Sequence, residues 1–180
     1  MKVVAIVGMA GAGKSEVARL LEEHGFEKVR FGDITDEELE KRRLETSEEN
    51  ERYIRQQLRK NHGMAAYAQL NLPRIDKALK SSNVVVDGLY SWEEYILLKE
   101  YYGKKFTTVA VCTSPATRYG RLAHRAERVL TMEEADSRDK SEIENINKGG
   151  PIAMADFTIV NEASLEELVR ETERVLSALK

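Results

Sequence analysis

A single cysteine, Cys112, occurs in the 180-residue sequence, so no disulfide can form within the chain. One free thiol fits a reducing compartment. Long apolar runs are lacking as well, because no stretch approaches the roughly 20 apolar residues of a membrane-spanning helix. The run Val3–Val7 is also shorter than the core of a signal peptide. We therefore expect a cytoplasmic protein with no membrane partner.

An excess of one charge is missing too. The 28 basic and 31 acidic residues give a net charge of −3, so no overall field draws the chain to nucleic acid, and we predict no such partner. Only 3 prolines and 11 glycines accompany 42% hydrophobic residues, which excludes a disordered or fibrous chain. We expect a single domain over residues 1–180.

Short β-branched runs alternate with longer helical patterns, which is typical of a parallel sheet wrapped by helices. The clearest helical patterns are Lys14–His24 and Leu165–Leu179, and Ser164 is the expected N-cap of the second. The predicted class is α/β. Five runs are too apolar to have a solvated face and are expected as interior strands: Val3–Val7, Lys28–Phe31, Val84–Asp87, Thr107–Cys112 and Phe157–Val160.

Two charged stretches do not fit this alternation. Asp36–Arg59 has helical propensity but few apolar anchors, which predicts an exposed helical insertion reaching to about residue 80. Arg121–Asn147 is a second charged helical stretch. The run Gly149-Gly150-Pro151 follows it and is expected to end the helix and act as a hinge. We predict a mobile lid over about residues 121–150.

The segment Gly8–Ser15 matches the phosphate-binding pattern G-x-x-x-x-G-K-[ST] without a mismatch. An expected strand enters it and an expected helix leaves it, so backbone N–H groups and a helix N-terminus would point at phosphates. Lys14 would reach the β- and γ-phosphate oxygens, and the Ser15 hydroxyl would bind Mg²⁺. The predicted nucleotide-binding residues are Gly8, Gly11, Ala12, Gly13, Lys14 and Ser15.

Two carboxylates are expected at the carboxyl edge of the sheet, where such folds bind ligands. Asp87 ends an apolar strand and would hold Mg²⁺ through water, although an Asp-Gly turn with Gly88 is the alternative. Asp33 follows Gly32 and would orient the acceptor or the water shell of the metal. The alternative for Asp33 is a cap on a helix that begins at Thr35.

In these motifs and their order, the sequence resembles the nucleoside-monophosphate-kinase-like P-loop kinases, most closely the small archaeal-type proteins related to adenylate kinase and dephospho-CoA kinase. The resemblance implies a three-layer P-loop NTPase fold with strand order 2-3-1-4-5. It also implies that the insertion holds the acceptor and that the lid closes over ATP. The resemblance spans nearly the whole chain and rests on Gly8–Ser15, Gly32-Asp33, Asp87-Gly88, Arg121–Arg125 and Ala155–Leu168.

Arginines of the expected lid suit phosphate binding. Arg118, Arg121 and Arg125 would share one side of a helix, and guanidinium groups bind phosphate oxygens through paired hydrogen bonds. A solvated charged face, paired with nearby carboxylates, is the alternative. The resemblance favours Arg121, Arg125 and Arg138 as catalytic residues.

The sequence departs from the family at the acceptor side. Related kinases commonly carry an arginine three residues after Gly-Asp and another after the later Asp-Gly, and both grip the acceptor phosphate. Here Asp36 and Tyr90-Ser91 occupy those positions. The candidates to replace them come from the insertion, namely Arg55 first and then Arg42, Arg43, Arg52 or Arg59.

The predicted function is Mg-ATP-dependent phosphoryl transfer to a small nucleotide-like acceptor, either a nucleoside monophosphate or dephospho-CoA. Ser15 and Asp87 are the predicted metal ligands, with ATP and Mg²⁺ as cofactors. The missing arginines also support an alternative, an ATP-binding regulatory protein with weak ATPase activity and no small-molecule acceptor. The predicted catalytic residues are Lys14, Asp33, Asp87, Arg121, Arg125 and Arg138.

Overall fold

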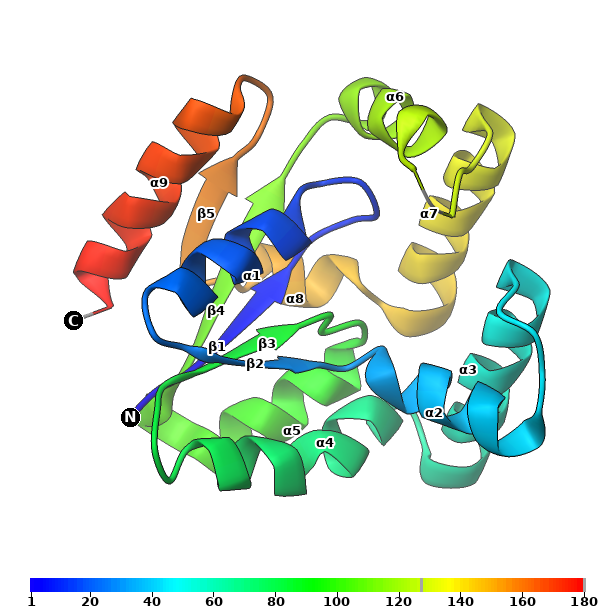
Figure 1. Cartoon of the computed structure of the whole chain (residues 1–180), viewed down its shortest axis with the longest axis horizontal. Coiled ribbons are helices and arrows are strands. Elements are labelled where there is room, and N and C mark those ends of the chain that lie inside the picture. Colours follow the sequence, from blue (N-terminus) through cyan, green and yellow to red (C-terminus); the bar gives the residue numbers. More distant parts are fainter. Residues whose placement is uncertain (127, 180) are drawn as a thin grey trace.

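The computed structural model describes residues 1–126 and 128–179. A five-stranded sheet forms its centre, and every neighbouring pair of strands is parallel. The strand order is β2-β3-β1-β4-β5, which confirms the predicted α/β class and topology (Figure 1). The strand bounds are β1 Val3–Val7, β2 Glu27–Arg30, β3 Val84–Asp87, β4 Phe106–Cys112 and β5 Phe157–Val160.

Helices connect the strands and form a layer on each face of the sheet (Figure 1). Their bounds are α1 Lys14–Glu23, α2 Asp33–Arg42, α3 Glu48–His62, α4 Ala66–Ala78, α5 Trp92–Tyr102, the 3₁₀ turn η1 Gly103–Lys105, α6 Pro115–His124, α7 Met132–Ile146, α8 Gly149–Ala153 and α9 Leu165–Ala178. Ser164 caps α9 as predicted, because its side chain accepts a hydrogen bond from the N–H of Glu167. Across residues 1–126 and 128–179, no helix combines the length and the apolar character that crossing a bilayer requires.

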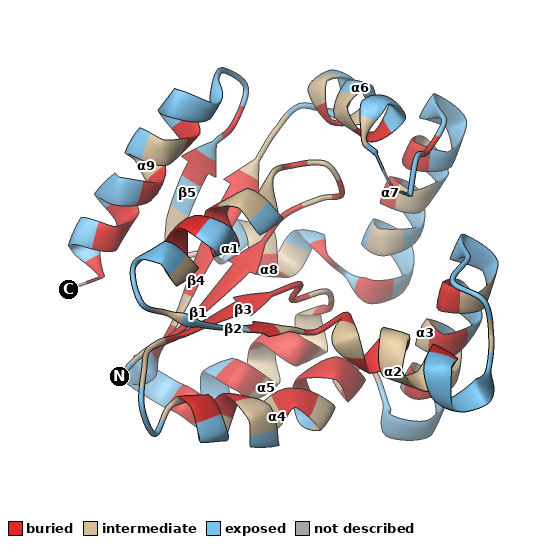
Figure 2. Ribbon diagram, in the orientation of Figure 1, coloured by how far each residue is buried: buried red, intermediate tan, exposed pale blue. Residues whose placement is uncertain are grey.

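Side chains of β1 alternate between two apolar cores, one on each face of the sheet. Val3, Ala5 and Val7 pack with α4 and α5, whereas Val4 and Ile6 pack with α1 and α9. Burial of both faces explains why a central strand reads as a continuous apolar run. Figure 2 shows this buried centre between partly exposed helices.

The expectation that all five strands lie in the interior is wrong for β2 and β5. Both are edge strands, and each carries exposed positions. Val160 of β5 is 64% exposed, although it belongs to an apolar run. A four-residue apolar run does not reveal whether a neighbouring strand covers both of its sides, so the edge position is decided by topology.

The insertion after β2 consists of two kinds of helix. α2 and α3 project to one side of the molecule, beyond the carboxyl ends of the strands (Figure 1). α4 instead packs under the sheet, where Tyr67 and Ile75 are fully buried. The projecting part of the insertion is therefore α2 and α3.

The lid stretch forms α6 and α7, which share a small apolar cluster of their own, separate from the two sheet cores. Its members are Ala10, Leu122, Leu130 and Ala135. The expectation that Gly149-Gly150-Pro151 ends the lid helix is wrong. Asn147 ends α7 in the left-handed conformation that Asn tolerates, and the Gly-Gly-Pro run begins α8, since proline is accepted in a first helical turn.

Candidate functional site

The loop Gly8–Ser15 connects β1 to α1 and depends on its glycines. Gly8, Gly11 and Gly13 have φ values of 147°, 77° and 100°. A Cβ at Gly8 would overlap the carbonyl oxygen of Val111, and one at Gly13 would overlap the side-chain amide of Asn161. Only glycine fits these two positions, so the loop packs closely against the ends of β4 and β5 in a backbone conformation that the phosphate-binding pattern requires.

The ends of β4 and β5 fix this loop from the side. The carbonyl of Ala12 accepts hydrogen bonds from the Asn161 side chain at 2.8 Å and from the Thr113 hydroxyl at 3.1 Å. The Thr113 hydroxyl is also 3.1 Å from the carbonyl of Asn161. The phosphate-binding loop is thus held to two strands of the sheet.

Lys14 lies in this loop, and the two cations and two carboxylates that act on its pKa leave its own positive charge unbalanced. Its ammonium group donates a 2.9 Å hydrogen bond to the carbonyl of Met9. Burial of the ammonium group, together with the nearby cation Lys148, lowers the pKa of Lys14 to about 7. A phosphate would supply the missing negative charge, so the residues present fit a nucleoside triphosphate.

Asp87 and Ser15 meet where the predicted metal ligands are expected. Asp87 ends β3 directly beside Ile6 of β1, two residues before the phosphate-binding loop. Burial raises the pKa of Asp87, while Lys14, Arg30 and the Ser15 hydroxyl oppose that rise. Within residues 1–126 and 128–179 no cluster of three His, Cys, Asp or Glu side chains is arranged to bind a metal. The carboxylate of Asp87 and the hydroxyl of Ser15 are oxygen donors of the kind that Mg²⁺ prefers, and Mg²⁺ takes its other ligands from phosphate and water.

A cavity of about 590 Å³ lies between the insertion and the lid, and we call it the charged pocket. It is lined by side chains of α2, α3 and α7 and by the ends of β2 and β3. Its charged lining residues are Arg30, Asp36, Glu48, Glu51, Arg52, Arg55, Arg59, Arg128, Arg138 and Glu142. The pocket is a charged rather than an apolar site.

One face of α3 supplies three of these arginines. Arg52, Arg55 and Arg59 recur at helical spacing and line the pocket, whereas the other two candidates, Arg42 and Arg43, do not line it. That these arginines replace the missing ones stays a prediction. Arg55 pairs with Glu48 at 2.7 Å. Arg59 differs, because its Nε is buried and has no hydrogen-bond partner among the described residues. Its guanidinium instead lies 5.5 Å from the ring centre of Tyr67.

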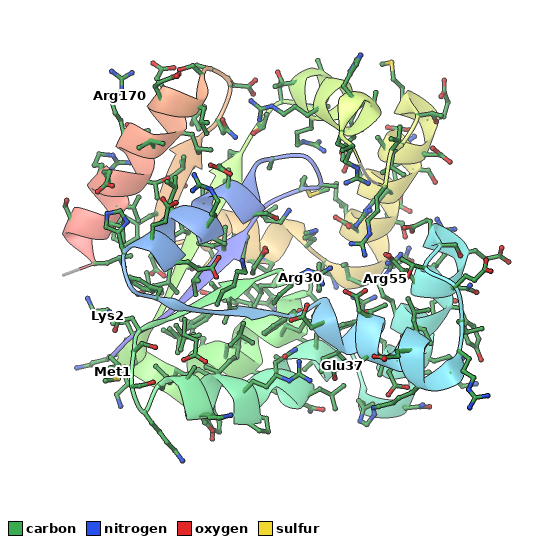
Figure 3. All side chains as sticks on the ribbon, viewed as in Figure 1. Met1, Lys2, Arg30, Glu37, Arg55 and Arg170 are labelled. Atoms are coloured by element: carbon green, nitrogen blue, oxygen red, sulfur yellow. The ribbon has the colours of Figure 1, made fainter. Side chains whose placement is uncertain are left out.

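Arg30 explains how the pocket tolerates an acid at position 36. Its Nη1 donates to Asp33 at 2.7 Å and to Asp36 at 2.6 Å. β2 thus supplies a cation next to the position where the resemblance predicts one, and Figure 3 labels Arg30 there, close to α2. Of these two carboxylates, Asp36 lines the pocket. The alternative role of Asp33 as a helix cap is wrong, because α2 begins at Asp33 after Gly32 and no side chain caps it.

The lid reaches the insertion through Arg128. Its guanidinium lies 3.0 Å from Glu51 and 3.6 Å from Asp36. These ion pairs join the loop between α6 and α7 to α2 and α3. They close one side of the charged pocket.

Glu142 on α7 joins two cations at the inner end of the pocket. It pairs with Arg138 at 3.1 Å and with Lys148 at 2.6 Å. Burial opposes ionisation, but Lys148 and Arg138 outweigh it and lower the pKa of Glu142 to about 2. The lid thus presents an ionised carboxylate held between two cations.

The three arginines expected on one side of the lid helix have different roles. Arg118 is buried and points into the protein, where it pairs with Asp139 at 2.6 Å and donates to the carbonyl of Ala10 at 3.1 Å. Nη1 of Arg121 and both Nε and Nη2 of Arg125 are buried without a hydrogen-bond partner among the described residues. Burial and the cations Arg138 and Arg128 lower the pKa of Arg125. Arg121 and Arg125 retain donors for an anion.

The sequence assigned no role to three charged residues that lie in or beside the candidate site, namely Lys148, Glu142 and Arg30. Lys148 is only 2% exposed and its ammonium group lies 5.4 Å from the ring centre of Tyr90. Nothing local in the sequence distinguishes a buried lysine from the many exposed ones. Arg30 had a local signal, because it ends a predicted strand at the ligand-binding edge of the sheet.

A family model for an AAA domain matches residues 4–147. Among curated proteins, a UPF0200 protein of Thermococcus kodakarensis is 36% identical over 181 residues, covering 98% of this chain and 97% of the relative. A UPF0200 protein of Hyperthermus butylicus is 36% identical over 179 residues, covering 98% of this chain and 94% of the relative.

Solved structures with the same fold include two small-molecule kinases. A gluconokinase from Sinorhizobium meliloti aligns with a TM-score of 0.61 at 16% identity and covers 99% of this chain and 93% of the gluconokinase. A shikimate kinase from Bacteroides thetaiotaomicron aligns with a TM-score of 0.62 at 13% identity, covering 99% and 98%. The P-loop-kinase fold is confirmed, and the narrower likeness to adenylate kinase and dephospho-CoA kinase stays a prediction.

Proposed function

The chain belongs to the AAA domain family and to the UPF0200 proteins, and on that premise we propose that it transfers the γ-phosphoryl group of Mg-ATP to a small anionic, nucleotide-like acceptor. The observation that carries this proposal is the closeness of two sites. Tyr90 lines the charged pocket three residues after Asp87, and Asp87 lies beside Ile6, just before the phosphate-binding loop. Arg138 and Glu142, which also line the pocket, are among the charges that act on the pKa of Lys14. An acceptor in the pocket would therefore lie next to the phosphate that Lys14 holds.

The chain supplies charge and alignment for this transfer. The bond from the γ-phosphorus to the bridging oxygen breaks with its electron pair left on ADP, and a bond forms to an acceptor oxygen. Lys14, Arg125 and Arg138 would stabilise the negative charge on the transferring group. Ser15 and Asp87 would hold Mg²⁺, which would supply a divalent positive charge to the phosphates. An acceptor hydroxyl would pass its proton to the Asp33–Asp36 pair, which Arg30 holds at the pocket edge.

The pocket supports an acceptor that itself carries phosphate. Arg59 offers a buried Nε with no partner among the described residues, and Arg55 and Arg52 lie along the same helix face. A buried guanidinium nitrogen without a partner is stabilised most by a hydrogen bond to an anionic oxygen. Nucleoside monophosphates and dephospho-CoA, which both carry phosphate, are the acceptors to test first.

A second function is favoured by the ion pairs inside the pocket. Asp36, Glu48, Glu51 and Glu142 already neutralise much of the arginine charge that an acceptor would meet. A pocket whose arginines are largely paired with its own carboxylates suits an ATP-binding regulatory protein with weak ATPase activity and no small-molecule acceptor. This alternative predicts Mg-ATP binding without acceptor-dependent turnover.

The deciding experiment measures ADP formation from Mg-ATP by the purified protein with a panel of nucleoside monophosphates, nucleosides and dephospho-CoA. We expect one acceptor to stimulate turnover and to gain phosphate, as detected by mass spectrometry. Lys14→Met should lower that turnover by about a thousandfold, because it removes a cation from the transferring phosphate.

Lys60→Met is the matched control, since Lys60 is an exposed lysine on α3. It should leave turnover unchanged. ATP binding with no phosphorylated product across the panel would contradict the kinase function and support the regulatory one. Equal losses in both lysine variants would contradict the assignment of Lys14.

A further inference from the structure

Lys148 is a charged side chain that the fold buries beside the phosphate-binding loop. The residue follows the left-handed Asn147 that ends α7, and only 2% of it is exposed. Its ammonium group pairs with Glu142 at 2.6 Å and lies 5.4 Å from the ring centre of Tyr90. Of the charged neighbours of Lys14, Lys148 has the largest effect on it.

The charges around this point do not balance. The ammonium group of Lys148 and the guanidinium of Arg138 share one carboxylate, that of Glu142, which leaves one positive charge in excess before Lys14 is counted. Two buried ammonium groups close together disfavour one another unless an anion lies between or beside them. The arrangement is therefore built for an additional negative group.

A purely structural role for the Lys148–Glu142 pair accounts poorly for its position. Buried ion pairs contribute little net stability, because desolvation offsets their attraction. The end of α7 is already closed without the side chain, since the backbone N–H of Lys148 donates to the carbonyl of Glu142 at 3.2 Å. The ammonium group has a different use.

We propose that Lys148 is a second lysine of the phosphate site, which reaches the γ-phosphoryl group of bound ATP from the lid side and is held in place by Glu142 as a positioning residue. This rests on the proposed nucleotide site, and it adds a contact that closes only when a γ-phosphate is present. Lys148 takes no part in the making or breaking of bonds. Its charge would stabilise the three oxygens of the transferring group together with Lys14.

The test compares the affinities of Mg-ATP and Mg-ADP by calorimetry, with no acceptor present. Lys148→Met keeps the apolar stem and removes the charge. We expect it to weaken Mg-ATP about 10- to 100-fold and to leave Mg-ADP within about twofold, because charge-assisted hydrogen bonds are worth that much. Lys148→Arg should recover most of the ATP affinity.

Lys140→Met is the matched control, because Lys140 lies on α7 and forms an exposed ion pair with Asp136 of that helix. It should change neither affinity. Unchanged affinities in Lys148→Met, or equal losses for Mg-ATP and Mg-ADP, would overturn the proposal. In that case Lys148 only supports the fold.

A measurement on the wild-type chain keeps the proposal testable if Lys148→Met does not fold. The NMR signal of the Lys148 side-chain Cε–Hε group should shift on addition of Mg-ATP and not of Mg-ADP. No shift with Mg-ATP would contradict the contact. Because no acceptor is present in these measurements, a chain that binds ATP through Lys148 but phosphorylates nothing would refute the kinase function and leave this site standing.

Discussion

The two halves of the candidate site are built by different physical means. The phosphate-binding loop is made of backbone, shaped by glycines and fixed to β4 and β5 through the carbonyl of Ala12. The charged pocket is made of long side chains held by ion pairs between helices. A site built from backbone is rigid and binds one chemical group that many ligands share. A site built from charged side chains can adapt to its ligand, and salt weakens its ion pairs. Nucleotide binding and acceptor recognition should therefore respond to quite different perturbations.

The largest effect should come from breaking the backbone half. Gly13→Ala places a Cβ at φ 100°, where it overlaps the Asn161 amide. We expect the free energy of unfolding to fall by about 2 kcal/mol and ATP affinity to fall more than about tenfold. Denaturant unfolding and calorimetry measure the two quantities.

Gly25→Ala separates the effect of backbone strain from the effect of a steric clash. Gly25 has φ 84° but nothing lies within 4 Å of its added Cβ. The free energy of unfolding of this variant should fall by about 1 kcal/mol, and the variant should bind ATP normally. Normal ATP binding by Gly13→Ala would contradict the assignment of the loop.

Raising the pH should also act on the backbone half. Lys14 has a pKa of about 7 in the free protein, owing to burial and to Lys148, and phosphate would raise that pKa in the complex. Above pH 7 the free protein has lost a proton that the complex keeps, so binding takes up a proton and affinity falls with rising pH. Calorimetry between about pH 7.5 and 9 should show a loss approaching tenfold per pH unit.

Lys14→Arg is the control for this pH effect, because arginine stays charged over the whole range. The ATP affinity of this variant should not change with pH over this range. A slope that persists in Lys14→Arg would assign the titration to another group.

The side-chain half should respond to the loss of Arg59. Arg59→Gln removes the cation whose Nε has no partner among the described residues. We expect the KM of the acceptor to rise about tenfold while the Kd of ATP stays within twofold. Arg42→Gln, which removes an arginine paired with Glu38 outside the pocket, is the comparison. A rise in the Kd of ATP would show that the two halves are not separable at Arg59.

The smallest effect should come from the link across the pocket. Arg128→Gln breaks the ion pairs of this half-exposed guanidinium with the buried Glu51 and the half-exposed Asp36. We expect about a two- to threefold loss of acceptor-dependent turnover at low salt. At about 0.5 M salt the variant and the wild type should converge, because screening weakens the pairs in the wild type. A difference that survives high salt would indicate a role beyond charge.

The same contrast explains what the sequence could predict. The phosphate-binding loop, the five strands and their order follow from local patterns and from the family resemblance, because glycine spacing and apolar runs act over a few residues. The edge positions of β2 and β5 do not, since they depend on which strands become neighbours. A short apolar run looks the same in either place.

Charged side chains of the site were the hardest to place. Helical spacing put Arg118 with Arg121 and Arg125, but Asp139, 21 residues later, draws Arg118 into the protein. Lys148 is buried between Glu142 of α7 and the ring of Tyr90, which follows β3, and no pattern in its own neighbourhood reports that. Long-range packing decides which of many similar charges becomes functional.

Arg118 has a thermodynamic consequence of its own. One guanidinium bonds both to the carbonyl of Ala10 in the phosphate-binding loop and to Asp139 on α7. The position of the lid helix and the shape of the loop are then coupled by one free energy, and such coupling is reciprocal. If a bound acceptor tightens ATP binding by drawing α7 inward, bound ATP must tighten acceptor binding by the same factor, so each substrate reports the arrival of the other.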